Sequence, residues 1–188
     1  MSKTITIKPK EFFNEETNRF INVKETTLVL EHSLISISKW ESHFKKPFLV
    51  EKSMSTVEEI IYYLKCMTIS PQNVDDMVYY AIDKETIEDI VKYINDPMTA
   101  TWFGEEKSTK SRKKEILTSE VIYWQMVALQ IPWECQKWHL NRLLTLIRVC
   151  GLKNEEQYGD KKKMPKADLL KRNAALNAQR RAKLGTKG

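Results

Sequence analysis

Glu115–Cys150 reads EILTSEVIYWQMVALQIPWECQKWHLNRLLTLIRVC and contains three of the five tryptophans of the chain. Thr118 or Ser119 is a suitable N-cap for a helix, and Pro132 suits the first turn of a second helix. Gly151 suits the end of that second helix. The stretch therefore predicts a helix–turn–helix hairpin. Its expected apolar faces are Val121, Trp124, Ala128 and Ile131 in the first helix and Leu140, Leu143, Leu144 and Ile147 in the second.

The first thirty residues have a β pattern instead. Thr4–Ile7 alternates threonine and isoleucine, and Thr26–Leu30 is rich in β-branched residues. Arg19–Val23 is a third candidate strand, and Asn14–Asn18 is suited to a turn. This region predicts a small hairpin or a three-stranded sheet.

Between these two regions the apolar spacing is helical. A first predicted helix carries Leu34, Ile37, Trp40 and Phe44 on one face and ends before Pro47. Thr56 and Glu59 have the spacing of a capping box at the start of a second helix. Two further helices are expected over the ranges Asn73–Ala81 and Thr86–Ile94, the latter ended by Pro97.

The fold class that follows is mainly α: a compact multi-helix domain with a small N-terminal β-hairpin or sheet and a basic C-terminal helix. We expect a body over residues 1–152, a polar linker over 153–164 and a basic helix or tail over 165–188. Gly104–Lys114, which lacks apolar periodicity, is expected to be a mobile solvated loop. The alternative is an ordered basic loop that contacts a partner.

Positive charge is concentrated at the C-terminal end of the sequence. Residues 161–188 hold ten Lys or Arg and one acid, a balance of +9, which leaves −3 for the other residues out of the total of +6. A nucleic-acid-binding domain would instead spread positive charge over a folded face. For the segment 161–188 we favour binding of a protein partner, then a role in solubility, then binding of nucleic acid.

Neither a membrane span nor a secretory leader is expected. No window approaches the roughly 18 continuous apolar residues that a membrane helix needs, and MSKTITIKPKEFF has no apolar core. The three cysteines, Cys66, Cys135 and Cys150, lack the spacing of a disulfide framework. They predict reduced thiols in a cytoplasmic protein.

No motif for catalysis, cofactor or metal is visible, so the sequence predicts a protein that is not an enzyme and has no cofactor. Glycine-rich phosphate loops cannot be written with five glycines, and HExxH, GxSxG and CxxC are all missing. Cys135 and His139 are one helical turn apart and could share an ion. Zinc sites need three or four protein ligands, however, so a structural role is favoured for this pair.

The second half of the hairpin has two interpretations. Trp133 and Trp138 could stack on nucleic-acid bases while Lys137, Arg142 and Arg148 contact phosphates. Alternatively, the tryptophans fill the core and the cations mark its solvent edge. We favour packing, because the leucine stripe of the helix needs to be covered.

Several stretches resemble a group of small proteins from tailed bacteriophages. They are LEHSLISISKWESHFKKPFL (Leu30–Leu49), NDPMTATWF (Asn95–Phe103), the hairpin itself and the basic ending KKMPKADLLKRNAALNAQRRAKLGTKG (Lys162–Gly188). The group is similar to phage tail assembly chaperones, which are encoded near the tape-measure gene. Such chaperones bind the long tape-measure protein and keep it soluble while the tail tube forms.

The resemblance implies a non-enzymatic chaperone in the host cytoplasm that is missing from the mature virion. Its expected partner is the tape-measure protein, and a homo-oligomer is also compatible with the sequence. The client is expected to bind reversibly in an apolar groove beside the hairpin. The predicted contact residues are Trp124, Trp133, Trp138 and Leu140 at this groove and Arg180, Arg181 and Lys183 in the basic segment. The alternatives are a structural virion component, such as a head–tail connector or minor tail protein, and a nucleic-acid-binding phage protein acting through residues 161–188.

Overall fold

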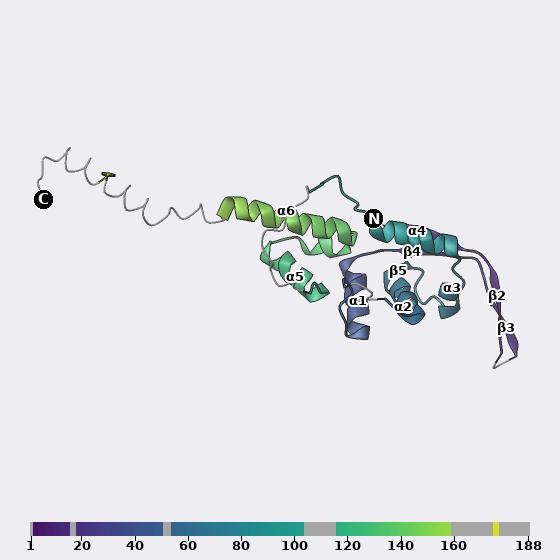
Figure 1. Cartoon of the computed structure of the whole chain (residues 1–188). Coiled ribbons are helices and arrows are strands. Elements are labelled where there is room, and N and C mark those ends of the chain that lie inside the picture. Colours follow the sequence, from purple (N-terminus) through teal and green to yellow (C-terminus); the bar gives the residue numbers. More distant parts are fainter. Residues whose placement is uncertain (1, 16–17, 51–53, 104–115, 159–174, 177–188) are drawn as a thin grey trace, which may run out of the picture. The chain divides into compact units, whose positions relative to one another are not determined.

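The computed structural model describes residues 2–15, 18–50, 54–103, 116–158 and 175–176. The chain divides into two compact units, Met1–Val149 and Cys150–Gly188. Among the described residues there are six α-helices, one short 3-10 helix and five strands (Figure 1). All of these elements lie in the first unit except the C-terminal part of the last helix.

The prediction of a mainly α fold is wrong, because the described residues form a mixed α/β fold with two small antiparallel sheets. One sheet has the strand order β1-β4-β5 and the other is β2-β3. The three predicted strands correspond to β1 (Lys3–Ile7), β3 (Arg19–Val23) and β4 (Thr26–Leu30). The sequence interpretation missed β2 (Lys10–Asn14) and β5 (Thr68–Ser70).

The first four strands form one long antiparallel ribbon. β1 pairs with β4 and β2 pairs with β3, and the register continues from one pair to the next. Ile7 lies opposite Thr26, and three residues further Lys10 lies opposite Val23. Pro9 lies at the interruption between the two ladders, where its missing N–H costs no ladder hydrogen bond.

The two halves of this ribbon differ in burial. On β1 and β4, Ile5, Ile7, Leu28 and Leu30 alternate with more exposed residues and belong to the core. β5, which directly follows α2, adds a third strand beside β4. The β2–β3 half has no third strand among the described residues.

The first four helices follow local sequence signals closely. α1 (Leu34–Phe44) ends before Pro47, and α2 (Val57–Met67) begins with the predicted Thr56–Glu59 capping box. Asp75 and Asp83 cap α3 (Asp76–Tyr80) and α4 (Lys84–Asn95) through hydrogen bonds to backbone N–H groups. These helix predictions are confirmed.

The predicted hairpin differs from the structure in three respects. α5 (Ser119–Ala128) is capped by Thr118 as expected, but Pro132 leads into the 3-10 helix η1 (Trp133–Lys137) instead of an α-helix. α6 (Leu140–Tyr158) continues through Gly151, so the predicted stop there is wrong. The predicted apolar face of α5 is wrong as well, since the helix buries Ser119, Ile122 and Met126.

In the second unit the described residues are the end of α6, Cys150 to Tyr158, and two helical residues at 175–176. The beginning of the predicted linker, residues 153–158, is therefore helical. The loop 104–114 and most of the basic segment lie outside the described residues. The domain boundaries remain a prediction.

Candidate interaction surface

α5 is apolar on its outer side as well as on its inner side. Its inner face, formed by Ser119, Ile122 and Met126, packs into the core. On the opposite side Trp124 is 68% exposed and Val127 is 66% exposed. An amphipathic surface helix would carry polar residues at such positions.

The next element extends this exposed apolar area. Trp133, at the start of η1, is 52% exposed. Its ring stacks on that of Tyr123, with 5.2 Å between the centroids and 29° between the planes. The Tyr123 hydroxyl donates a hydrogen bond of 3.1 Å to Oε1 of Gln136, which ties α5 to η1. We refer to Tyr123, Trp124, Val127 and Trp133 together as the aromatic surface.

A buried carboxylate fixes the position of α5. Glu41 of α1 accepts the backbone N–H of Ser119 at Oε2 and that of Phe48 at Oε1, both at 2.8 Å. Ser119 is in the first turn of α5, where backbone N–H groups lack partners within the helix and the helix dipole favours a negative charge. Glu41 therefore links α1 to α5 across 78 residues of sequence.

The turn after α5 places η1 beside it. The N–H of Ile131 donates to the carbonyl of Met126 at 2.8 Å, and Gln130 has a left-handed backbone with φ of 53°. Ile131 and Cys135 are buried beneath this turn, which leaves Trp133 on the outside. The aromatic surface is thus supported by core residues on both of its elements.

The predicted contact residues differ in their exposure. Trp124 and Trp133 are exposed, so the preference for core packing is wrong for both. Trp138 is half-buried, and the Arg142 guanidinium lies 4.3 Å from its ring centroid. Leu140 is buried and cannot contact a partner. The predicted tail contacts Arg180, Arg181 and Lys183 lie outside the described residues.

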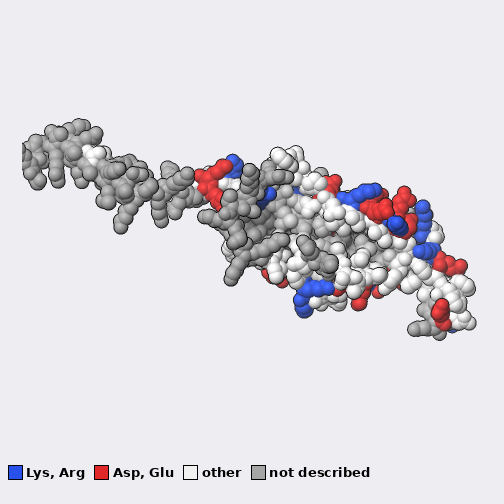
Figure 2. Space-filling model, in the orientation of Figure 1, with Lys and Arg blue, Asp and Glu red and all other residues white. Residues whose placement is uncertain are grey.

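The arginines of α6 already have aromatic neighbours. Arg142 lies over Trp138, and Cζ of Arg148 lies 4.0 Å from the ring centroid of Phe103. On the face of the molecule seen in Figure 2, positive and negative side chains are interspersed. This mixed arrangement is unlike the positive face typical of nucleic-acid-binding domains.

Two histidines and two tyrosines form a polar cluster inside the first unit. Nδ1 of His32 lies 2.5 Å from the Tyr63 hydroxyl, and the rings of His32 and His139 are 5.0 Å apart. Nε2 of His139 donates to the Tyr93 carbonyl at 2.9 Å, and the Tyr93 hydroxyl accepts the backbone N–H of His32 at 3.2 Å. The cluster thereby joins the end of β4, α2, α4 and the start of α6.

Burial determines the protonation of this cluster. It lowers the pKa of His32 to about 3, with a further contribution from the neighbouring His139, and it also lowers the pKa of His139. Burial raises the pKa of Tyr63, so this hydroxyl stays protonated and donates to the neutral His32 ring. Since both imidazoles are buried, neither can reach a substrate as a general base. The cluster holds four elements together.

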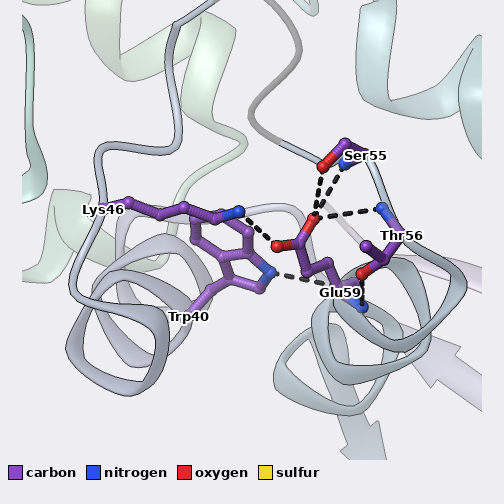
Figure 3. A network of polar contacts seen from close by, with 5 residues as sticks. All are labelled: Trp40, Lys46, Ser55, Thr56 and Glu59. Atoms are coloured by element: carbon purple, nitrogen blue, oxygen red, sulfur yellow. Dashed lines mark hydrogen bonds and ion pairs between the residues drawn. The ribbon is translucent and has the colours of Figure 1, made fainter.

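A second polar network surrounds the carboxylate of Glu59 (Figure 3). Lys46 pairs with Oε1, while Oε2 accepts the backbone N–H of Ser55 at 2.8 Å and that of Thr56 at 3.1 Å. The hydrogen bond from Lys46, followed by that from Ser55, lowers the pKa of Glu59 to about 2. A carboxylate with this many donors is stabilised as an anion, so Glu59 stays ionised near neutral pH while it caps the start of α2.

Metal ligation finds no support among the described residues, where no group of three or more His, Cys, Asp and Glu side chains is placed to hold an ion. Cys135 lies in a 3-10 helix and is buried. Nε2 of His139 is committed to the Tyr93 carbonyl. The pairing of Cys135 with His139 that their spacing allowed therefore gains no further ligand.

Comparison of the chain with known protein families, with curated proteins and with solved structures finds no significant match. None of the helices within the described residues combines the length and apolarity needed to cross a membrane. The described residues thus form a mixed α/β fold with an exposed aromatic surface on α5 and η1.

The sequence held a signal for this surface that periodicity alone did not resolve. SEVIYWQMVA of α5 is apolar on nearly every side, so it cannot place all of its apolar residues in one core. A helix that is apolar on all sides is normally buried on all sides. The structure departs from this rule, because Trp124 and Val127 of α5 are exposed.

Proposed function

We propose that this protein binds an amphipathic helical segment of a protein client through the aromatic surface. We further propose that the client is the tape-measure protein of a tailed bacteriophage and that the protein is a tail assembly chaperone. The observation that carries the first step is the exposure of Trp124, Val127 and Trp133, which are close in sequence and lie on two elements with buried core residues. The second step rests on the sequence resemblance.

The chemistry of the surface fits a helical client. Tryptophan and tyrosine are the side chains that most often dominate binding energy at protein interfaces, where they fill apolar pockets. An apolar stripe at i, i+3, i+4 and i+7 on a client helix would cover Trp124 and Val127 and leave its polar face in water. Exposed apolar areas of this kind on a single chain mark sites of interaction.

The size of the surface fits reversible binding. It consists of four side chains, of which Tyr123 is partly covered by its stack on Trp133. Obligate interfaces are larger and more apolar than such a patch. A chaperone must release its client when the tail tube forms, so a small surface suits the proposed role.

The basic segment 161–188 complements this surface at the level of sequence. Its balance of +9 raises the net charge of any complex with an aggregation-prone client. We propose that this charge keeps the chaperone–client complex soluble.

Co-expression with a tape-measure protein tests the function. The wild-type chain, Trp124→Ala/Trp133→Ala and Trp102→Ala would each be produced together with the tape-measure protein encoded beside this chain's gene. The soluble fraction of the client would then be measured. Trp102 is a matched control, because it is 83% exposed and belongs to neither α5 nor η1.

We expect the wild type and Trp102→Ala to keep the client soluble and the double variant to lose most of this effect. A client that is equally soluble with and without the wild-type protein would overturn the chaperone proposal. Equal activity of the double variant would leave a chaperone but overturn the aromatic surface as its site.

Two further measurements separate the alternative functions. A chaperone is missing from purified virions, whereas a head–tail connector or minor tail protein would be found in them. A nucleic-acid-binding protein would bind DNA with a steep salt dependence that disappears when residues 161–188 are removed.

A further inference from the structure

The β2–β3 half of the ribbon forms an arm whose strands are mostly exposed. We call Lys10–Asn14 and Arg19–Val23 together the β-arm. Figure 1 shows this ribbon leaving the helices that pack around β1, β4 and β5. Of the strand residues in β3, only Val23, at the base of the arm, is buried.

Both faces of the β-arm carry apolar side chains. Phe13 and Phe20 are cross-strand partners, 51% and 64% exposed, with ring centroids 5.1 Å apart. On the opposite face Phe12 pairs with Ile21, and both are half-buried. A two-stranded ribbon is at best marginally stable in water, and three or more strands are needed for independent stability. With two strands and apolar side chains on both faces, the β-arm is suited to pairing with further strands.

The two outer edges of the β-arm are not equivalent. Pro9 directly precedes β2 and removes a backbone donor from that edge, which is a common way to prevent strand addition. The other edge, RFINVKE from Arg19 to Glu25, contains no proline. The open edge of the β-arm is thus β3.

The charges along this edge are self-complementary. When β3 pairs antiparallel with β3 of a second copy about a two-fold axis at Asn22, Arg19 lies opposite Glu25 of the second copy, and the reverse pair forms as well. Ile21 then lies opposite Val23 of the second copy. A shift by one residue is excluded, because directly opposite residues of an antiparallel pair place their side chains on the same face of the sheet. A shift by two residues in either direction separates Arg19 from Glu25 and removes both opposite-charge pairs. One register is therefore favoured.

We propose that the β-arms of two copies of this chain pair through their β3 edges and form a four-stranded antiparallel sheet. The occupant of the edge is a second copy because the edge matches its own sequence: each dimer has two Arg19–Glu25 pairs related by the two-fold axis. The pairing also brings two Phe12–Ile21 faces into one continuous apolar surface. This surface shares no residue with the aromatic surface.

Charge reversal tests this dimer directly. The full-length wild type, Arg19→Glu and Glu25→Arg would be compared by sedimentation velocity, with Lys84→Glu, a reversal at an exposed position of α4, as control. We expect dimers of the wild type and of Lys84→Glu. Each arm variant faces two like-charge pairs, and its dimer dissociation constant should rise at least about tenfold.

Mixing the two arm variants gives the decisive result. A chain with Glu at both positions and a chain with Arg at both positions form two opposite-charge pairs, so the mixture should recover the dimer that each variant alone has lost. Circular dichroism checks that both variants remain folded. A monomeric wild type, single variants that dimerise as well as the wild type, or a mixture that stays monomeric would each overturn the proposal.

Discussion

Trp40 and the tryptophans of the α5–η1 region show two uses of the same side chain. Trp40 is fully buried in α1, its indole N–H donates to the Glu59 carbonyl at 3.0 Å, and the Lys46 ammonium lies 5.5 Å from its ring centroid. Trp124 and Trp133 are exposed, although core residues support the elements that carry them. The difference shows that tryptophans in a sequence do not by themselves identify core residues, because their burial depends on which elements pack over them.

Removing the buried indole should have the largest effect. Trp40→Ala deletes a side chain that packs against Phe44 and Phe48, with centroid distances of 4.9 and 5.2 Å. We expect the free energy of unfolding to fall by about 3–5 kcal/mol, the usual cost of truncating a buried aromatic side chain. Urea denaturation followed by circular dichroism measures this loss. A loss of no more than about 0.5 kcal/mol, the range of ordinary surface substitutions, would contradict the role of Trp40 as a core residue.

Acidification should lower the free energy of unfolding, because the core contains two buried histidines, His32 and His139. The pKa of His32 is about 3 in the folded chain, against an ordinary value of 6.5. Between these pH values the unfolded chain binds a proton that the folded chain does not, so stability is complete above pH 6.5 and declines as the pH falls. His32 contributes up to about 1.4 kcal/mol per pH unit, and His139 shifts stability in the same direction.

Denaturation curves at pH 7 and pH 5 measure this slope, and over this interval we expect a loss of about 2 kcal/mol. His43→Gln is a suitable control, because His43 is exposed and stacks on Tyr62 instead of joining the buried cluster. The control should keep the slope, whereas His32→Gln should flatten it. Equal stability of the wild type at both pH values would contradict the account of the cluster.

Much of the fold could be predicted because its signals are local. The Thr56–Glu59 capping box, the helices α3 and α4 and the strands β1, β3 and β4 all follow from residues within a few positions of one another. β2 and β5 could not be predicted in this way. KEFFN of β2 has no clean alternation, and TIS of β5 is too short; each becomes a strand through pairing with β3 or β4.

The candidate site was predicted only in part, for a similar reason. Trp124 and Trp133 were among the predicted contact residues, but the spacing of apolar residues could not decide their exposure, because α5 is apolar on nearly every side. The face of α5 that is exposed depends on how the helix is anchored, and one anchor is the hydrogen bond from Ser119 to Glu41, 78 positions away in sequence. Likewise, His32 and His139 gave no sign of forming a pair, because only the fold brings them together.

The smallest effect on stability is expected at the aromatic surface. Trp124→Ala and Val127→Ala remove exposed side chains, so each should change the free energy of unfolding by no more than about 0.5 kcal/mol. Urea denaturation under the conditions used for Trp40→Ala gives the comparison. A loss as large as that of Trp40→Ala would show that these side chains belong to the core.

Site-specific photocrosslinking tests the central claim most directly. A photoreactive amino acid would replace Val127 at the centre of the aromatic surface or, as a control, Val57 of α2, which is 65% exposed against 66% for Val127. Each chain would be irradiated in cells that also produce the tape-measure protein. We predict a crosslink to this client from position 127 and none from position 57. Crosslinks of equal yield from both positions, or from position 57 alone, would contradict the assignment of the aromatic surface as the client-binding site.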